Sequence, residues 1–76
     1  MQYDKDKADE IVLALLYLGI HDGSRTWKGI DWDSMNRLHQ KGFISNPINK
    51  TKSVMLTDAG EKMSEQLFKQ FFAKQP

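Results

Sequence analysis

Two stretches of the chain decide its fold: Arg37-Leu38-His39-Gln40-Lys41-Gly42-Phe43-Ile44 and, after a polar segment, Ser53-Val54-Met55-Leu56-Thr57-Asp58-Ala59-Gly60. The first has the pattern of a helix that ends at Gly42 and is followed by a strand over 43–45. The second has the pattern of a strand over 53–56, after which Thr57 caps another helix. Residues 46–52 would then form the loop of a two-stranded β-hairpin. This order predicts an α+β fold in which a hairpin separates two helices.

Apolar residues at helical spacing extend this prediction to the rest of the chain. Three main helices are expected, each after a side chain that can cap it: 5–18 after Asp4 or Asp6, 32–41 after Asp31 or Asp33, and 58–73 after Thr57. Gly19 is expected to end the first helix. Residues 24–28 would add one helical turn. The chain is therefore predicted to be one mostly helical domain, residues 1–76.

Composition limits the class of protein. With 76 residues the core must be thin. The chain has no cysteine, which excludes disulfides and thiolate metal sites. The longest apolar stretch, residues 11–20, is about half of a membrane span, and the acidic residues before it are unlike a signal peptide. We expect a cytoplasmic protein without membrane contact.

Charge is distributed unevenly along the chain. Residues 1–33 carry four basic and seven acidic side chains, whereas residues 34–76 carry seven basic and three acidic side chains.

The chain resembles known proteins at two levels. Residues 31–60 resemble the hairpin region of bacterial winged-helix regulators, through Leu38, Gly42, Ile44, Leu56, Thr57 and Gly60. The whole chain is similar to a family of small, functionally uncharacterised bacterial proteins, through residues 13–18, 25–33, 37–39, 47 and 50–54. The first resemblance implies a winged-helix-like fold and DNA binding. The chain departs from the regulator pattern because it has no full-length second helix.

A DNA-binding surface is predicted on the exposed side of the 32–41 helix and on the loop that follows it. Six polar or basic side chains make up this prediction: Asn36, Arg37, Gln40, Lys41, Lys50 and Lys52. Arginine, asparagine and glutamine can bond base edges, and lysine neutralises phosphate. Asp31 and Asp33 at the start of the helix would repel phosphate. The alternative is an ordinary solvated helix face with a polar loop.

A second candidate surface combines two tryptophans with nearby cations. Its residues are Arg25, Trp27, Lys28 and Trp32. Exposed indoles beside cations could stack on bases or anchor a protein partner. The alternative is that both indoles fill the thin core, with Arg25 paired to Asp31 or Asp33.

A homodimer is predicted from apolar residues that do not fit one buried face. In the first helix Ala8, Ile11, Val12, Leu15 and Leu18 share one side, and in the last helix Ala59, Met63, Leu67 and Phe71 form a stripe. The residues left over would form the dimer interface: Leu13, Tyr17, Phe68 and Phe72. The alternative is a core that reaches further around both helices.

No enzymatic or metal-binding motif is expected. His21 and His39 lack the spacing of metal ligands, and the chain has no phosphate-binding loop or nucleophile motif. We expect neither cofactor nor metal. The prediction is a DNA-binding homodimer that acts as a transcriptional regulator. A protein-interaction module on the same scaffold, without nucleic-acid binding, is the alternative.

Overall fold

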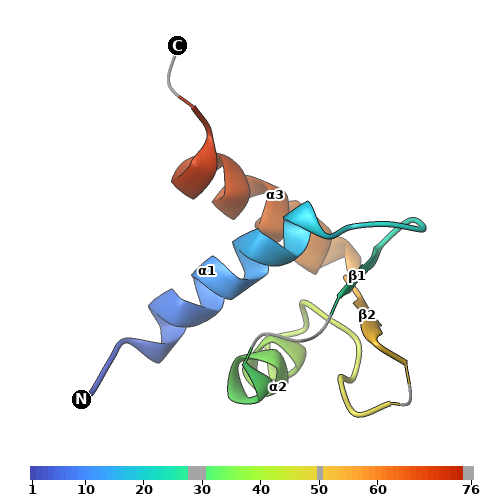
Figure 1. The fold of residues 1–76 in the computed structure, drawn as a ribbon, viewed down its shortest axis with the longest axis horizontal. Coiled ribbons are helices and arrows are strands. Elements are labelled where there is room, and N and C mark those ends of the chain that lie inside the picture. The colour runs from blue at the N-terminus through green and yellow to red at the C-terminus, as the bar shows by residue number, and fades with distance from the viewer. Residues whose placement is uncertain (28–30, 50, 75–76) are drawn as a thin grey trace.

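The computed structural model describes residues 1–27, 31–49 and 51–74 (Figure 1). Within them the chain forms three helices and two short strands, in the order α1 (Lys5–Leu18), β1 (Arg25–Trp27), α2 (Trp32–Gln40), β2 (Ser53–Met55) and α3 (Asp58–Phe72). The α+β class, with three helices and a two-stranded antiparallel sheet, is confirmed. No described helix is long and apolar enough to cross a membrane.

The helices begin where the sequence predicts, because a polar side chain caps each first turn. Asp4 accepts from the Lys7 amide, Asp31 from the Ser34 amide and Thr57 from the Gly60 amide, each at 3.0 Å. After α2, Gly42 adopts φ +81°, a left-handed conformation that glycine adopts without a steric penalty. The chain turns there, and the Phe43 amide donates to the Leu38 carbonyl at 3.0 Å.

The first strand lies elsewhere than predicted. Residues 25–27 form β1 rather than a helical turn, and Lys28 lies outside the described residues. β1 is antiparallel to β2, with Thr26 opposite Val54. Thr26 is completely buried, and its hydroxyl donates to the Leu16 carbonyl at 2.6 Å. That bond holds Thr26, a β-branched residue, against α1 in an extended conformation. The turn signals in the neighbouring sequence did not indicate this conformation.

Segment 43–45 still lies beside β2, as an isolated bridge rather than a strand. Ile44 pairs with Leu56, and the Ser45 amide donates to the Met55 carbonyl at 2.8 Å. On the other side of β2, the Leu56 amide donates to the Ser24 carbonyl at 2.8 Å. β2 is therefore the central segment, between β1 and residues 43–45.

The core lies where α1 crosses α3, and α2 and β1 close it on the other sides of α1 (Figure 1). Its buried apolar residues come from the three helices, from β2 and from the residues beside β2: Val12, Leu13, Ala14, Leu16, Met35, Leu38, Ile44, Val54, Leu56 and Leu67. The molecule is thin, with extents of 41 × 36 × 19 Å. The C-terminal half of α3 extends away from α2 and the sheet (Figure 1).

Two predicted helix faces were rotated from the observed ones. Leu13 is buried, whereas Leu15 and Leu18 are exposed. The buried side of α1 contains the charged residue Asp9, which an apolar pattern leaves out. In α3 the buried residues include Gly60 and Ser64, and Ala59 is exposed. Small residues lie on the inner face because α3 packs directly on the backbone of residue 43.

Candidate functional site

Arg37 does not extend freely from α2, because it binds a buried carboxylate. Its Nε lies 2.7 Å and its Nη2 2.9 Å from the two carboxylate oxygens of Asp9 on α1. The Asp9 side chain is 1% exposed and that of Arg37 is 23% exposed. Nη2 also donates to the Ser34 hydroxyl at 3.1 Å. This two-point contact holds α2 against α1 and engages Nε and Nη2 of the guanidinium.

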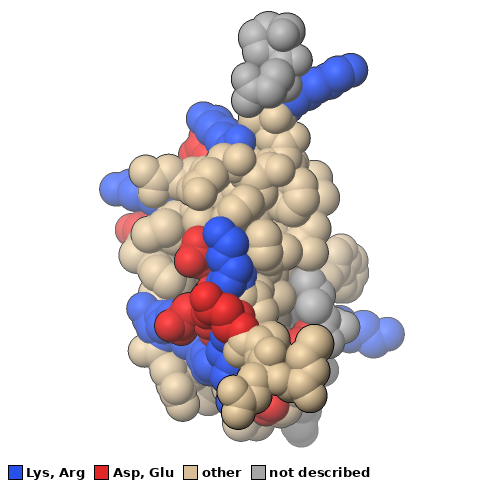
Figure 2. Space-filling model, turned by 90° about the vertical axis from the view of Figure 1, so that its left-hand side faces the viewer, with Lys and Arg blue, Asp and Glu red and all other residues tan. Residues whose placement is uncertain are grey.

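Lys41 is engaged by the same acidic group. Its Nζ lies 3.2 Å from Asp6 and 3.2 Å from Asp9. Burial raises the pKa of Asp9, but hydrogen bonds from Arg37 and Lys41 outweigh that effect, so its pKa lies below its ordinary value. Burial lowers the pKa of Lys41, but the hydrogen bonds that its ammonium donates to Asp9 and Asp6 more than reverse this, so its pKa lies above its ordinary value. Cations and carboxylates consequently lie side by side on the face drawn in Figure 2, rather than in separate patches.

The remaining predicted DNA-binding residues are placed more openly. On α2, Asn36 is half-buried and Gln40 is exposed, one helical turn apart. Lys52 is exposed on the 46–52 loop, and Lys50 lies outside the described residues. This loop and α2 both lie at the end of the molecule opposite the C-terminus of α3 (Figure 1).

Short polar side chains hold the described part of the 46–52 loop in shape. The Asn46 side-chain oxygen accepts from the Ile48 amide at 2.9 Å, and the Asn49 side-chain oxygen accepts from the Thr51 amide at 2.9 Å. The Thr51 hydroxyl also contacts the Ser53 carbonyl at 2.9 Å. Such turns order a loop without strand pairing. Ile48 is 69% exposed, so the loop also presents an apolar side chain.

The two tryptophans lie on the surface. Trp27 is 58% and Trp32 52% exposed, so the interpretation that both fill the core is wrong. The Trp27 ring stacks on His21, with ring centroids 4.8 Å apart. Arg25 and Trp27 are both exposed on β1, and Thr26 between them points inward. No ion pair of Arg25 is found within the described ranges, and Asp31 instead caps α2.

The predicted dimer residues fall into two groups. Leu13 is 1% exposed in the core of its own chain, so the expectation that it faces a second copy is wrong. The other three form a row of aromatic rings. Tyr17 lies 5.1 Å from Phe68, which lies 5.4 Å from Phe72, measured between ring centroids. Phe72 is 44% exposed at the end of this row.

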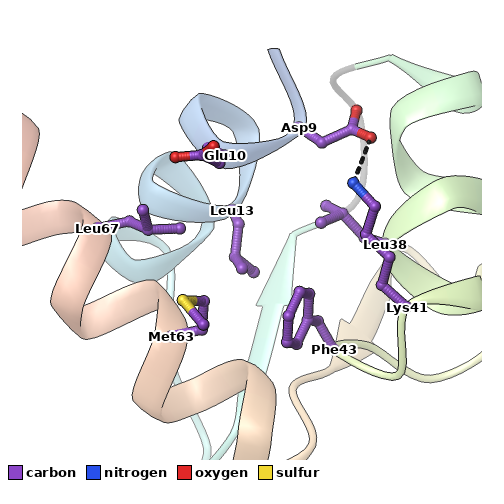
Figure 3. A pocket seen from close by; sticks show the side chains of 8 residues that line it. All are labelled: Asp9, Glu10, Leu13, Leu38, Lys41, Phe43, Met63 and Leu67. Carbon is purple, nitrogen blue, oxygen red and sulfur yellow. Dashed lines mark hydrogen bonds and ion pairs between the residues drawn. The ribbon is translucent and has the colours of Figure 1, made fainter. Parts of the chain in front are cut away.

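A pocket that the sequence did not predict opens between α1, α2 and α3 (Figure 3). It is lined by Asp9, Glu10, Leu13, Leu38, Lys41, Phe43, Met63 and Leu67. Its signal in the sequence was the helical spacing of Asp9, Leu13 and Leu16, which places an acid on a buried face. Within the described ranges, no group of three or more His, Cys, Asp or Glu side chains is arranged to hold a metal ion.

Comparison with known proteins gives the family of the chain. Residues 4–74 match the model of a domain of unknown function, DUF6429. The chain is 49% identical to the uncharacterized protein y4hR of Sinorhizobium fredii (strain NBRC 101917 / NGR234) over 74 residues, which are 97% of this chain and 100% of that protein. No solved structure matches the chain. The protein therefore belongs to the DUF6429 family.

Proposed function

We propose that this protein binds double-stranded DNA through α2 and the 46–52 loop, in the manner of a winged-helix domain. The observation that carries the proposal is the order of the extended segments. β2 lies between β1 and residues 43–45, and the loop that joins the outer segment to β2 projects at the same end as α2. Winged-helix domains arrange their sheet, wing and recognition helix in this order.

The contact surface of the proposal differs from the predicted one. Gln40 and Asn36 carry the amides that could bond base edges, and Lys52 carries the charge for phosphate. Arg37 and Lys41 have a different role in the proposal, because both hold α2 against the acidic residues of α1. Phosphate contacts would then be few, and binding would depend less steeply on salt than in a strongly basic regulator.

Fluorescence anisotropy of a labelled random-sequence duplex tests the proposal. The titration is done at about 50 mM and about 200 mM salt. On logarithmic axes the affinity falls linearly with salt concentration, and each neutralised phosphate makes this slope steeper by about 0.9. Lys52→Ala should weaken binding to all sequences and reduce that slope by about one. Lys74→Ala is the matched control, since Lys74 is exposed just after α3, whose C-terminal end lies opposite α2 in the molecule (Figure 1), and it should leave the slope unchanged.

Two outcomes would count against DNA binding. One is the absence of any anisotropy change at low salt, and the other is an equal effect of the two lysine variants.

A homodimer is part of the proposal, with Phe72 at the contact because it is exposed at the end of the aromatic row. Phe72→Asp should then shift a dimer to a monomer in sedimentation velocity, whereas Lys69→Asp on the same helix should not.

The exposed indoles favour a second candidate function, a protein-interaction module. Trp27 and Trp32 are each more than half exposed, and large aromatic side chains supply much of the binding energy at protein interfaces. A photo-crosslinker at position 27 should capture a defined partner, while one at Lys62, exposed on α3, should not. Equal capture from both positions would argue against this function.

A further inference from the structure

The pocket between the three helices has a fixed apolar floor. Leu13 and Leu38 are each 1% exposed and Leu67 is 6% exposed, so these walls belong to the core. Phe43 and Met63 are half-buried and form the adjustable sides. Leu13 points from α1 into the space between these two side chains (Figure 3). The surface from which an apolar molecule could displace water therefore comes mainly from Phe43 and Met63, with Leu13, Leu38 and Leu67 behind them.

The size of the pocket limits what can enter it. Its volume is about 340 Å³. That lies at the lower end of the roughly 300–1,000 Å³ found for ligand pockets, and it corresponds to roughly ten water molecules. A compound with one ring or a short alkyl chain fits such a volume.

The polar rim offers one unused group. Asp9 and Lys41 bond to each other at 3.2 Å, and Lys41 also bonds Asp6. Glu10 is half-buried at the rim and has no hydrogen bond or ion pair with any part of the chain that the structure describes. Both oxygens of its carboxylate are therefore available to a ligand.

The charges around the rim favour a cation. Of the residues that line the pocket, two carry a carboxylate, Asp9 and Glu10, and Lys41 carries a cation that is already paired with Asp6 and Asp9. An anionic ligand would have to compete with two carboxylates for Lys41. An ammonium group can instead pair with Glu10 through a charge-assisted hydrogen bond.

We infer that this pocket binds a small organic amine. The ammonium group lies at Glu10, and the apolar body lies between Leu13, Phe43 and Met63. The inference does not depend on DNA binding. Two features carry it together: an apolar cavity of ligand size and an unpaired carboxylate at its rim.

Titration of the full-length chain, followed by ¹H–¹⁵N correlation spectra at neutral pH, tests this site. The probes are phenethylamine, phenethyl alcohol and hydrocinnamate, which share a ring and short linker but differ in charge. Phenethylamine should cause saturable shifts at residues 10, 13, 43 and 63. The alcohol should bind about tenfold more weakly, because it lacks the charge-assisted hydrogen bond. The carboxylate should bind most weakly of the three.

Two variants separate the polar from the apolar part of the site. Glu10→Gln keeps the shape of the side chain and should weaken binding of phenethylamine about tenfold while leaving phenethyl alcohol unchanged. Glu65→Gln is the matched control on α3, where Glu65 pairs with Lys69 and does not line this pocket. Met63→Trp, which fills the cavity, should abolish binding of both probes.

The inference is overturned by any of three results. Phenethylamine and phenethyl alcohol could bind equally well, Glu10→Gln could bind the amine as the native protein does, or the shifts could fall outside the pocket. The spectra of the variants also report their folding, so a loss of binding is read only from a folded protein.

Discussion

Replacement of Gly60 by alanine should destabilise the protein, although it lies within a helix. A Cβ built at Gly60 would overlap the carbonyl oxygen of Phe43 and would lie 2.7 Å from its carbonyl carbon. Both contacts are with backbone, so no side-chain rotation can relieve them. α3 and residues 42–43 must move apart.

The size of the effect follows from the bonds that this movement breaks. The Thr57 amide donates to the Phe43 carbonyl at 3.0 Å, and the Thr57 hydroxyl donates to the Gly42 carbonyl at 2.6 Å. Loss of both costs about 2 kcal/mol, and overpacking adds about 1–3 kcal/mol. The higher helix propensity of alanine returns about 1 kcal/mol. The net loss of about 2–4 kcal/mol is a large part of the roughly 4–11 kcal/mol expected for a domain of this length.

Urea denaturation, followed by far-UV circular dichroism, measures this loss. Ala59→Gly is the matched control, because Ala59 is exposed in the same helical turn and should lose only about 1 kcal/mol of propensity. The contact argument is refuted if Gly60→Ala is as stable as the native protein or more stable.

The remaining predictions concern two buried polar side chains. The pKa of Asp9 is lowered from 3.8 in the fold, because the hydrogen bonds from Arg37 and Lys41 outweigh its burial. The stability that its ionised form contributes is therefore present above about pH 4 and is lost as the pH falls further. The urea midpoint should consequently drop less steeply in acid for Asp9→Leu than for the native protein. Parallel curves of midpoint against pH would contradict this. Thr26→Val keeps the shape of the side chain but removes the hydroxyl that donates to the Leu16 carbonyl at 2.6 Å. This should lower the free energy of unfolding by about 1 kcal/mol in the same urea assay. An unchanged urea midpoint would contradict the prediction.

The sequence predicted the helices well because their ends depend on local chemistry. Asp4, Asp31 and Thr57 cap the helices through contacts only three residues away, and Gly42 ends α2 through its own φ angle. The strand at 25–27 could not be predicted in this way. Its conformation depends on Val54, 28 positions after Thr26, and on the Leu16 carbonyl. Such distant partners leave no periodic pattern in a three-residue segment.

The candidate site was predicted only in part, because the contacts that define it also join residues far apart in the sequence. Side-chain type alone suggested that Arg37 and Lys41 would face DNA, and it gave no sign that Asp9 lies buried beside them. Asp9 lies in the second turn of α1 at helical spacing from Leu13 and Leu16, but a carboxylate is rarely buried unless it is paired, and its partner Arg37 is 28 positions away in the sequence. The exposure of Trp27 was equally unpredictable, because it follows from the position of β1 on the surface.

Among the helices and strands that the structure describes, only α1 packs closely against α2. Much of that attachment is the ionic contact of Arg37 and Lys41 with Asp9, together with the buried side chains of Met35 and Leu38. α2 can therefore open as a separate unit of local unfolding, while α1 and α3 remain packed. Amide hydrogen exchange in α2 should then accelerate in acid before exchange in α1 does, so that the attachment of this helix responds to pH while the rest of the fold remains intact.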